Sequence, residues 1–328
     1  MEFSEQGNLG ACSYCDEEAF IYRRYSGERL CKSCFISKIE EKIHKTISKY
    51  DMMTPDDRII VAVSGGKDSL TLLYNLMKIQ EKTYNSKELI ALSLNEGIKG
   101  YRDLTIEKAK KFCQRYSISH HIMDVRDYLD TTLDMIISRK QKERDNQNAC
   151  NFCALIRRRL LNAGAKQLNG DILAMGHNLT DVAETFLMNI FFKRFHKIQN
   201  QYFFKTPSSQ LENIYIKKIK PLFKIPENEI QLYSKLKDFD YYSQLCPYRK
   251  SDPIIRKRVL NIINDFKQSS PEIEFNLVNG FLELSELLYK QKEQKKINLC
   301  KKCGYPSGKQ DICNFCSLKM EIKGSKEG

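Results

Sequence analysis

Short apolar runs alternate with amphipathic segments through the middle of the chain. The apolar runs are rich in β-branched and aliphatic residues and have the length of buried strands: residues 58–63, 88–94 and 171–176. Segments with apolar positions at helical spacing accompany them: residues 69–82, 102–116 and 150–169. Because strands that alternate with helices favour a parallel arrangement, the pattern predicts an α/β fold with a doubly wound parallel sheet.

The two ends of the chain do not follow this alternation. A helical pattern at about residues 35–50 leads from an N-terminal segment into the central region, and after about residue 267 the pattern is mostly helical. We therefore expect three units: an N-terminal module with its linking helix (1–50), a central domain (51–267), and a C-terminal helix with a second small module (268–328).

Each terminal segment carries four cysteines, arranged as two Cys-x2-Cys pairs. Fifteen residues separate the N-terminal pairs and predict a hairpin that turns at Ser26 and Gly27, whereas nine residues separate the C-terminal pairs. Four thiolates at such spacing are typical of structural zinc, and a closed tetrahedral site leaves no position for a substrate. We expect two structural Zn²⁺ ions, held by Cys12, Cys15, Cys31, Cys34, Cys300, Cys303, Cys313 and Cys316.

The composition is that of a chain with one full domain and smaller attachments: 328 residues, of which 41% are hydrophobic. The formal net charge of +13 indicates a polyanionic partner, although a lysine-rich composition accounts for it equally well. The first residues lack a signal-peptide pattern, and no apolar run approaches the roughly 18 residues of a membrane span. We expect a cytoplasmic protein, not bound to a membrane, whose twelve cysteines are reduced.

The stretch SGGKDS, residues 64–69, lies between the first predicted strand and the helix that follows it. Its glycines allow backbone amides to approach an anion, Asp68 and Ser69 favour a helix start, and the helix N-terminus adds positive potential. A tight strand-to-helix turn uses the same residue types, and the Walker pattern is absent. The position of the stretch after a strand and before a helix predicts a phosphate-binding loop.

Three further cysteines lie in the central region without a fourth. Cys150 and Cys153 open a predicted helix in which Arg157 follows Cys153 by one turn, so we expect lowered thiol pKa values. Cys246 lies in a polar loop, QLCPYRKSD, where packing gives little reason for a thiol. Burial at a helix start is the alternative for the first two. Cys113 lies in an amphipathic stretch, and we expect it in the core.

Three thiolates are an incomplete ligand set for a metal that prefers four ligands. If they hold three irons of a 4Fe-4S cluster, the fourth iron keeps a position for an exogenous ligand such as hydrosulfide. Catalytic zinc sites differ from structural ones by the same kind of open position. The central cysteines therefore indicate a reactive site and not a structural one.

Taken together, these features resemble the tRNA 2-thiouridine synthetases of the TtuA/NcsA type. These enzymes are PP-loop ATP pyrophosphatases and relatives of the eukaryotic cytoplasmic tRNA 2-thiolation protein. The resemblance covers nearly the whole chain and includes both terminal cysteine sets. Its motifs are RRYSGERLC, VAVSGGKDS, LNEGIKGYRD, CNFCALIRR, GHNLTDVAET, KPLFKIPENEI and CPYRKSD.

The resemblance implies an enzyme that adenylates the C2 oxygen of a tRNA uridine with ATP and Mg²⁺ and replaces it with sulfur. It implies a three-cysteine 4Fe-4S cluster, a sulfur donor that is sulfide or a ubiquitin-like thiocarboxylated protein, and a homodimer. The RRYSGE stretch favours the wobble uridine slightly over the T-loop uridine. The implied catalytic residues are Cys150, Cys153, Cys246, Lys67 and Asp181. The implied nucleotide-binding residues are Val63, Ser64, Gly65, Gly66, Lys67, Asp68, Ser69, Arg157, Gly176 and Asp181.

The chain departs from the family pattern at two positions. Thr180 stands where relatives often carry aspartate, which removes one possible metal or ATP contact, and Ala154 replaces a common glycine. His177 is compatible with a structural or a catalytic role. Other functions also stay open: persulfide chemistry at Cys150 or Cys246, another adenylating PP-loop enzyme of the lysidine-ligase or amidotransferase type, or a zinc-ribbon RNA-binding adaptor.

Overall fold

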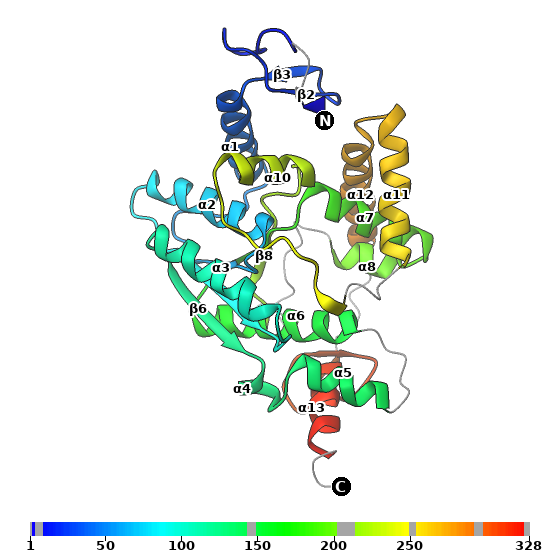
Figure 1. Cartoon of the computed structure of the whole chain (residues 1–328). Coiled ribbons are helices and arrows are strands. Elements are labelled where there is room, and N and C mark those ends of the chain that lie inside the picture. The colour runs from blue at the N-terminus through cyan, green and yellow to red at the C-terminus, as the bar shows by residue number, and fades with distance from the viewer. Residues whose placement is uncertain are drawn as a thin grey trace.

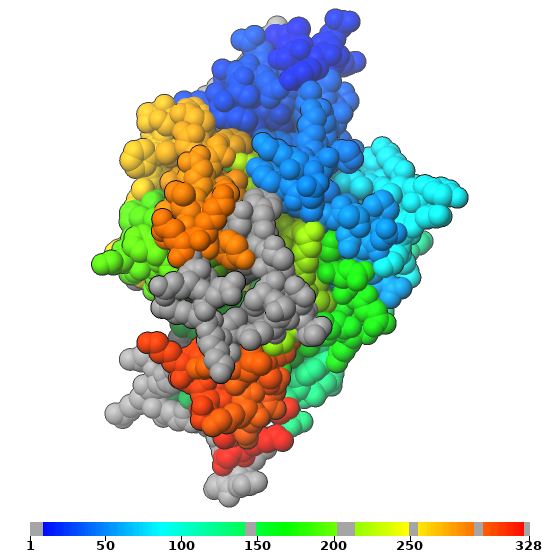
Figure 2. All heavy atoms as spheres, turned by 180° about the vertical axis from the view of Figure 1, so that it is seen from behind, coloured from blue at the N-terminus to red at the C-terminus, as the bar shows by residue number. Residues whose placement is uncertain are grey.

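The protein is described by a computed structural model that covers residues 2–3, 9–142, 149–201, 214–248, 254–291 and 298–324. A central parallel sheet lies between two helical layers, and a small cysteine-bearing module lies at each end of the molecule (Figure 1). The space-filling view from behind also places the N-terminal module and α13 (Asn314–Gly324) at opposite ends (Figure 2). The expected α/β architecture with two terminal modules is confirmed.

The sheet has five parallel strands in the order β6-β5-β4-β7-β8. Their bounds are β4 (Ile59–Ala62), β5 (Ile90–Asn95), β6 (Ser119–Asp124), β7 (Ile172–Ala174) and β8 (Lys217–Ile219). From β4 the chain builds the sheet outward through β5 and β6, and then returns to add β7 and β8 on the other side. Ligands of doubly wound sheets bind beyond the carboxyl ends of the strands at such a reversal, which here is the end of β4.

Side chains on successive positions of β4 enter two different cores, as the alternation of a strand requires. Val61 belongs to the core that includes Leu72 of α2 (Lys67–Glu81) and Phe112 of α3 (Arg102–Arg115). Ile60 belongs to the core on the other face, with Ile156 of α6 (Ala149–Gln167). The first face also carries α7 (Leu179–Phe191), α8 (Phe195–Asn200) and α10 (Glu227–Leu236), and the second carries α4 (Arg126–Leu129) and α5 (Leu133–Lys142).

The N-terminal module is a three-stranded antiparallel sheet followed by a long helix: β1 (Glu2–Phe3), β2 (Ile21–Arg23), β3 (Glu28–Leu30) and α1 (Lys32–Lys49). The predicted hairpin and helix are present, although the helix begins earlier than expected because the Cys31 side chain caps it by accepting from the Cys34 amide. The module contacts the central domain through a buried ion pair of Arg23 with Glu229 of α10.

The C-terminal half adds α11 (Ile254–Ser269) and α12 (Ile273–Lys290), and then β9 (Asn298–Leu299), β10 (Pro306–Gly308) and α13 (Asn314–Gly324). The expected unit boundary at residue 267 falls at the end of α11, and α12 packs on α7, where the Phe281 and Phe186 rings lie 5.8 Å apart. Helix α12 therefore shares the core of the central domain. Among the described residues, no helix combines the length and the apolar character that would let it cross a bilayer.

Candidate active site and metal centres

The SGGKDS stretch forms the connection from β4 to α2 and is held in shape by its own serines. The Ser64 amide donates to Ser69 Oγ at 3.1 Å, and Ser69 Oγ donates to the Gly66 carbonyl at 2.9 Å. Gly65 has φ +82°, and a Cβ at this position would collide with the Thr105 carbonyl, so only glycine fits. The loop ends at the N-terminus of α2, where the first helical amides have no partner within the helix. This is the geometry of an anion cradle.

Lys67 lies within the loop and is held by two carboxylates. Its Nζ is 2.7 Å from Glu227 Oε1 and 3.0 Å from Asp68 Oδ2. Burial disfavours the charged amine, but the negative charges of Asp68 and Glu227 outweigh this effect and raise the pKa of Lys67. The amine is therefore charged at neutral pH and suited to a phosphate oxygen.

The GHN stretch, residues 176–178, brings the start of α7 against the phosphate loop. Asn178 caps α7 by accepting from the Asp181 amide at 2.9 Å, and its Nδ2 donates to Asp68 Oδ1 at 2.9 Å. A Cβ on Gly176 would lie 3.1 Å from the Ser69 amide nitrogen, so glycine permits the close approach. Burial raises the pKa of Asp181, whose Oδ1 accepts from Arg256 at 3.1 Å. Asp68 and Asp181 are thus carboxylates of the kind that bind Mg²⁺ together with substrate phosphates.

The departure at Thr180 has a structural consequence. The Thr180 hydroxyl donates to Glu274 Oε1 at 2.7 Å and accepts from the Glu227 amide at 3.2 Å. This residue therefore joins α7, α10 and α12 behind the phosphate loop. His177 is neutral because burial lowers its pKa to about 3, and its Nδ1 has no hydrogen-bond partner among the described residues. Its catalytic role stays a prediction.

A buried carboxylate, Glu96, lies at the carboxyl end of β5. It connects the part of the site with the phosphate loop to the part with the central cysteines. It is fully buried, and its Oε2 lies 2.5 Å from Arg102 Nε. Its other oxygen accepts from Arg157 Nε. Two guanidinium groups therefore share one carboxylate, which satisfies an otherwise costly buried charge. The proposed nucleotide contact of Arg157 must use its remaining donors.

The central cysteines lie beside this pair of arginines. Cys150 and Cys153 occupy the first turn of α6, one turn before Arg157, as expected. The expected lowering of the thiol pKa is wrong for Cys153. Burial raises its pKa to about 11, and the negative potentials of Glu96 and Cys246 add to burial against the effect of Arg157.

The segment that carries Cys246 crosses the phosphate loop. The Tyr242 amide donates to the Gly65 carbonyl at 3.0 Å, and the Tyr242 ring packs edge-on against Tyr101 at 5.6 Å. Cys246, Tyr101 and Cys153 all pack against the same apolar core. The fold therefore brings Cys246 to the same core as Cys153, which lies 93 residues away in the chain. The second half of CPYRKSD, from residue 249, lies outside the described residues.

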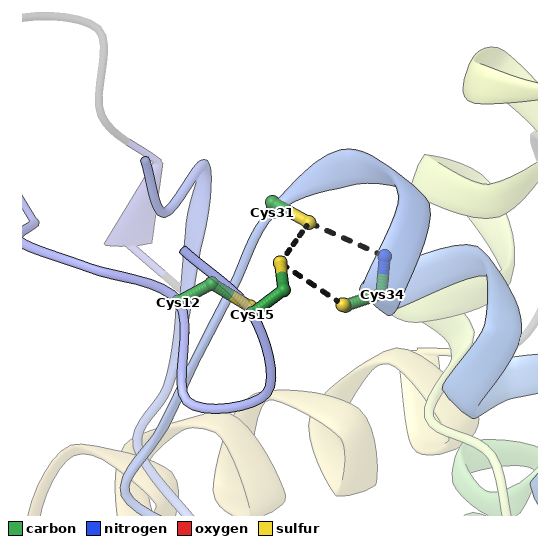
Figure 3. Close-up of side chains that lie close together, drawn as sticks. All are labelled: Cys12, Cys15, Cys31 and Cys34. Atoms are coloured by element: carbon green, nitrogen blue, oxygen red, sulfur yellow. Dashed lines mark hydrogen bonds between the residues drawn. The ribbon is translucent and has the colours of Figure 1, made fainter. Parts of the chain in front are cut away.

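The two terminal cysteine sets have the geometry of mononuclear sites. In each set the four sulfur atoms lie within 4.8 Å of one another. In the N-terminal set Cys15 Sγ is 3.6 Å from Cys31 Sγ and 3.5 Å from Cys34 Sγ, and all four sulfurs point toward one space (Figure 3). The Cys303 and Cys313 sulfurs are 3.6 Å apart. Zinc–sulfur bonds of about 2.3 Å in a tetrahedron place sulfurs about 3.8 Å apart, so both sets fit zinc.

The central cysteines do not form such a compact group. Within the described part of the chain, only the terminal sets bring their sulfurs together at that spacing. Ligands of a 4Fe-4S cluster bind separate irons and lie farther apart than four thiolates around one ion. The partly buried position of Cys153 and Cys246 against the apolar core fits such a group. Cys113 is a core residue, as expected, and burial raises its pKa to about 12.

Several residues of the site had no assigned role in the sequence. Glu96, Arg102, Glu227 and Arg256 belong to the polar network, and the first three lie in motifs that were recognised only as family signatures. A charged residue directly after a buried strand was the available signal for Glu96. Val63 uses its amide for Leu92 and its carbonyl for Ser93, so its contact with a nucleotide stays a prediction.

The chain is similar to known proteins along almost its whole length. The PP-loop domain family matches residues 36–261, and the N-terminal LIM domain of the 2-thiouridine synthetase TtuA matches residues 12–36. The tRNA-5-methyluridine(54) 2-sulfurtransferase of Pyrococcus horikoshii is 33% identical, over 95% of this chain and 95% of the relative. The cytoplasmic tRNA 2-thiolation protein 1 of Danio rerio is 34% identical, over 94% and 87%.

A solved structure agrees with the same assignment. The U34-tRNA thiolase NcsA from Methanococcus maripaludis with its [4Fe-4S] cluster superposes with a TM-score of 0.80 at 34% identity, covering 95% of this chain and 96% of that one. The PP-loop match spans more than half of the chain, and the relatives are similar over nearly their full length. The chain therefore belongs to the PP-loop family of tRNA 2-thiolation proteins of the TtuA/NcsA type.

Proposed function

We propose that the chain transfers sulfur to C2 of a tRNA uridine in an ATP-dependent reaction. The observation that carries this proposal is the hydrogen bond from the Tyr242 amide to the Gly65 carbonyl. This hydrogen bond holds the segment that carries Cys246 against the phosphate loop, which supports a proposed thiolate site and a proposed adenylation site at the same edge of the sheet. Adenylation of the lysidine-ligase or amidotransferase type gives no reason for three cysteines at this position.

The first step activates the uridine. The C2 oxygen attacks the α-phosphorus of ATP, a new oxygen–phosphorus bond forms, and pyrophosphate leaves. Residues 64–69 donate backbone and hydroxyl hydrogen bonds to the phosphates, and the charged Lys67 amine stabilises the negative charge of the transferring group. Mg²⁺, when bound at Asp68 and Asp181, neutralises phosphate charge as a Lewis acid. Arg157, held by Glu96, contacts the nucleotide with the donors that the ion pair leaves available.

The second step replaces oxygen by sulfur. Sulfide forms a bond to C2, the C2–oxygen bond breaks, and AMP leaves with the oxygen. Cys150, Cys153 and Cys246 would hold a 4Fe-4S cluster, which when bound offers an iron without a protein ligand as a position for sulfide. Burial beside the apolar core limits access of water to this site.

We propose the wobble uridine as the target, with the T-loop uridine as the competing outcome. The wobble assignment is supported by the similarity to the U34-tRNA thiolase, while the 33% identical relative modifies uridine 54. We also propose a homodimer and a sulfur donor that is sulfide or a thiocarboxylated ubiquitin-like protein. The name of the Danio rerio relative supports a cytoplasmic site for the reaction.

An anaerobic reaction of the full chain with unmodified tRNA, ATP, Mg²⁺ and sulfide tests this function. We expect 2-thiouridine in the nucleoside digest, with AMP and pyrophosphate formed in equal amounts. Fragment mass spectrometry then assigns the modified position. Tight tRNA binding without AMP release would favour an RNA-binding adaptor. Full activity without iron, together with a trappable disulfide at Cys150 or Cys246, would favour persulfide chemistry.

A further inference from the structure

A cavity of about 410 Å³ lies between α6 and the C-terminal module, apart from the candidate active site. Helix α6 contributes Arg159 and Leu160 to its wall, and α13 contributes Lys319, Met320 and Lys323. None of the proposed nucleotide or cluster residues lines it. Its volume lies in the range of cavities that hold small organic ligands, about 300–1,000 Å³.

Arg159 presents an incompletely paired cation at this cavity. Its guanidinium carbon lies 3.1 Å from the ring centroid of Tyr305 and 5.6 Å from that of Phe315. Its Nη1 is buried and has no hydrogen-bond partner within the described part of the chain. A buried donor without a partner is costly, so an acceptor that reaches this guanidinium from the cavity would stabilise it.

Three lysines add to the positive charge of the cavity: Lys302, Lys319 and Lys323. In the described residues none of them forms an ion pair, whereas the neighbouring Lys301 pairs with Asp311 at 2.6 Å. Four thiolates around one Zn²⁺ would carry a net charge of −2, so the four cations that line the cavity would still leave a surplus of two positive charges. This surplus attracts an anionic ligand.

The remaining wall of the cavity is apolar. Leu160 and Met320 line it together with the ring of Phe315. A bare phosphate would use the cations and leave this surface unused, whereas a nucleotide has both an anion and a flat base. Proteins that read unpaired RNA stack the base on aromatic side chains or guanidinium planes and hold its backbone with basic residues.

We propose that this cavity binds one unstacked nucleotide of the tRNA substrate, with the phosphate at Arg159 and the lysines and the base against the apolar wall. The inference rests on the proposed function, since it assigns a second contact to the same substrate. Helix α13, which lines the cavity, lies at the C-terminal end of the molecule (Figure 1). It would bind a nucleotide of the tRNA other than the reacting uridine and set the orientation of the tRNA.

The test compares two double variants of the full-length chain in tRNA binding, measured by fluorescence anisotropy at fixed salt. The cavity variant is Lys319→Gln with Lys323→Gln. The matched control is Lys301→Gln with Lys309→Gln, which removes the same charge from exposed lysines of the same module outside the cavity. We expect about tenfold weaker binding for the cavity variant, with a salt slope reduced by between about one and two, and a change of less than about twofold for the control. Equal affinities of the two variants overturn the proposal.

Ultraviolet cross-linking of the wild-type complex supplies a second measurement. We expect one tRNA nucleotide joined to the peptide of residues 314–323, and its loss in the cavity variant. If free AMP displaces the tRNA cross-link with an affinity equal to that of tRNA, the cavity is a site for free nucleotides and the proposal is overturned. Displacement of the cross-link by an acidic peptide but not by a nucleotide would also overturn it. If wild-type chain binds no tRNA, the proposed function itself fails. If it binds and thiolates tRNA but the two variants behave alike, only this inference fails.

Discussion

The terminal and the central cysteines of this chain are built in opposite ways. Each terminal set collects four ligands from a short stretch, such as residues 12–34, and its sulfurs approach to within 4.8 Å. The central set joins Cys153 of α6 to Cys246 of a distant loop, beside a buried carboxylate and the phosphate loop. A closed local set suits the stabilisation of a small module, whereas a set assembled by the sheet would place a metal next to the proposed chemistry.

The substitution Cys246→Ser should produce the largest effect on activity. We expect thiolation to fall by about 10³-fold or more, because one of three cluster ligands is lost, while pyrophosphate release on tRNA continues. Iron content should fall and zinc should stay at about two ions per chain. Cys113→Ala is the matched control, since Cys113 is buried away from the site. Retention of thiolation in the Cys246 variant would place the sulfur chemistry elsewhere.

The substitution Lys67→Ala separates the adenylation half of the site from the cysteine half. Loss of a charge that stabilises the transferring phosphoryl group should reduce tRNA-dependent pyrophosphate release by about 10²- to 10³-fold. Iron and zinc contents should not change, because Lys67 contacts only Asp68 and Glu227 among the charged groups described. Lys87→Ala, at an exposed lysine, is the control. A parallel loss of iron would mean that the two halves are not independent.

The substitution Cys34→Ser should affect stability more than chemistry. It removes one ligand from a closed set, and structural zinc contributes on the order of 10 kcal/mol of apparent binding free energy to such modules. We expect zinc to fall to about one ion per chain and a new early transition in thermal unfolding, with iron retained. Loss of iron together with zinc would contradict the independence of the two regions, which the buried ion pair of Arg23 with Glu229 joins.

The smallest expected effect is the pH dependence of the alkylation rate of Cys153. Because burial holds the pKa of Cys153 at about 11, its thiolate fraction in cluster-free protein should rise about tenfold for each pH unit between pH 7 and pH 10. Mass spectrometry of peptides alkylated with iodoacetamide measures this rate. A rate that levels off near pH 8 would mean that Arg157 dominates over burial at this thiol.

The sequence predicted the parts of the fold that rest on local patterns. The buried strands β4, β5 and β7 lie inside or within one residue of the expected runs, because central parallel strands are continuously apolar. The strands β6 and β8 were not expected. Both lie at the edges of the sheet, where polar residues such as His120 and Lys217 interrupt the apolar run that identifies a buried strand.

The candidate site was predictable only where its residues are neighbours in sequence. The phosphate loop follows from its motif between a strand and a helix, and both terminal cysteine sets follow from their spacing. The sharing of Glu96 by two arginines and the bridge of Thr180 to Glu274 require elements that meet only in the folded chain. The expected thiol pKa of Cys153 was wrong for the same reason, since burial is a tertiary property.

The difference between the terminal and the central cysteines is tested most directly by measuring iron, zinc and thiolation activity on the same anaerobically purified full-length protein. We expect about four irons and about two zincs per chain, and complete loss of thiolation when a chelator removes iron but leaves zinc. Restoration of iron and sulfide should restore activity. Iron-free protein that retains two zincs and thiolates tRNA at the full rate would contradict the assignment of the central cysteines.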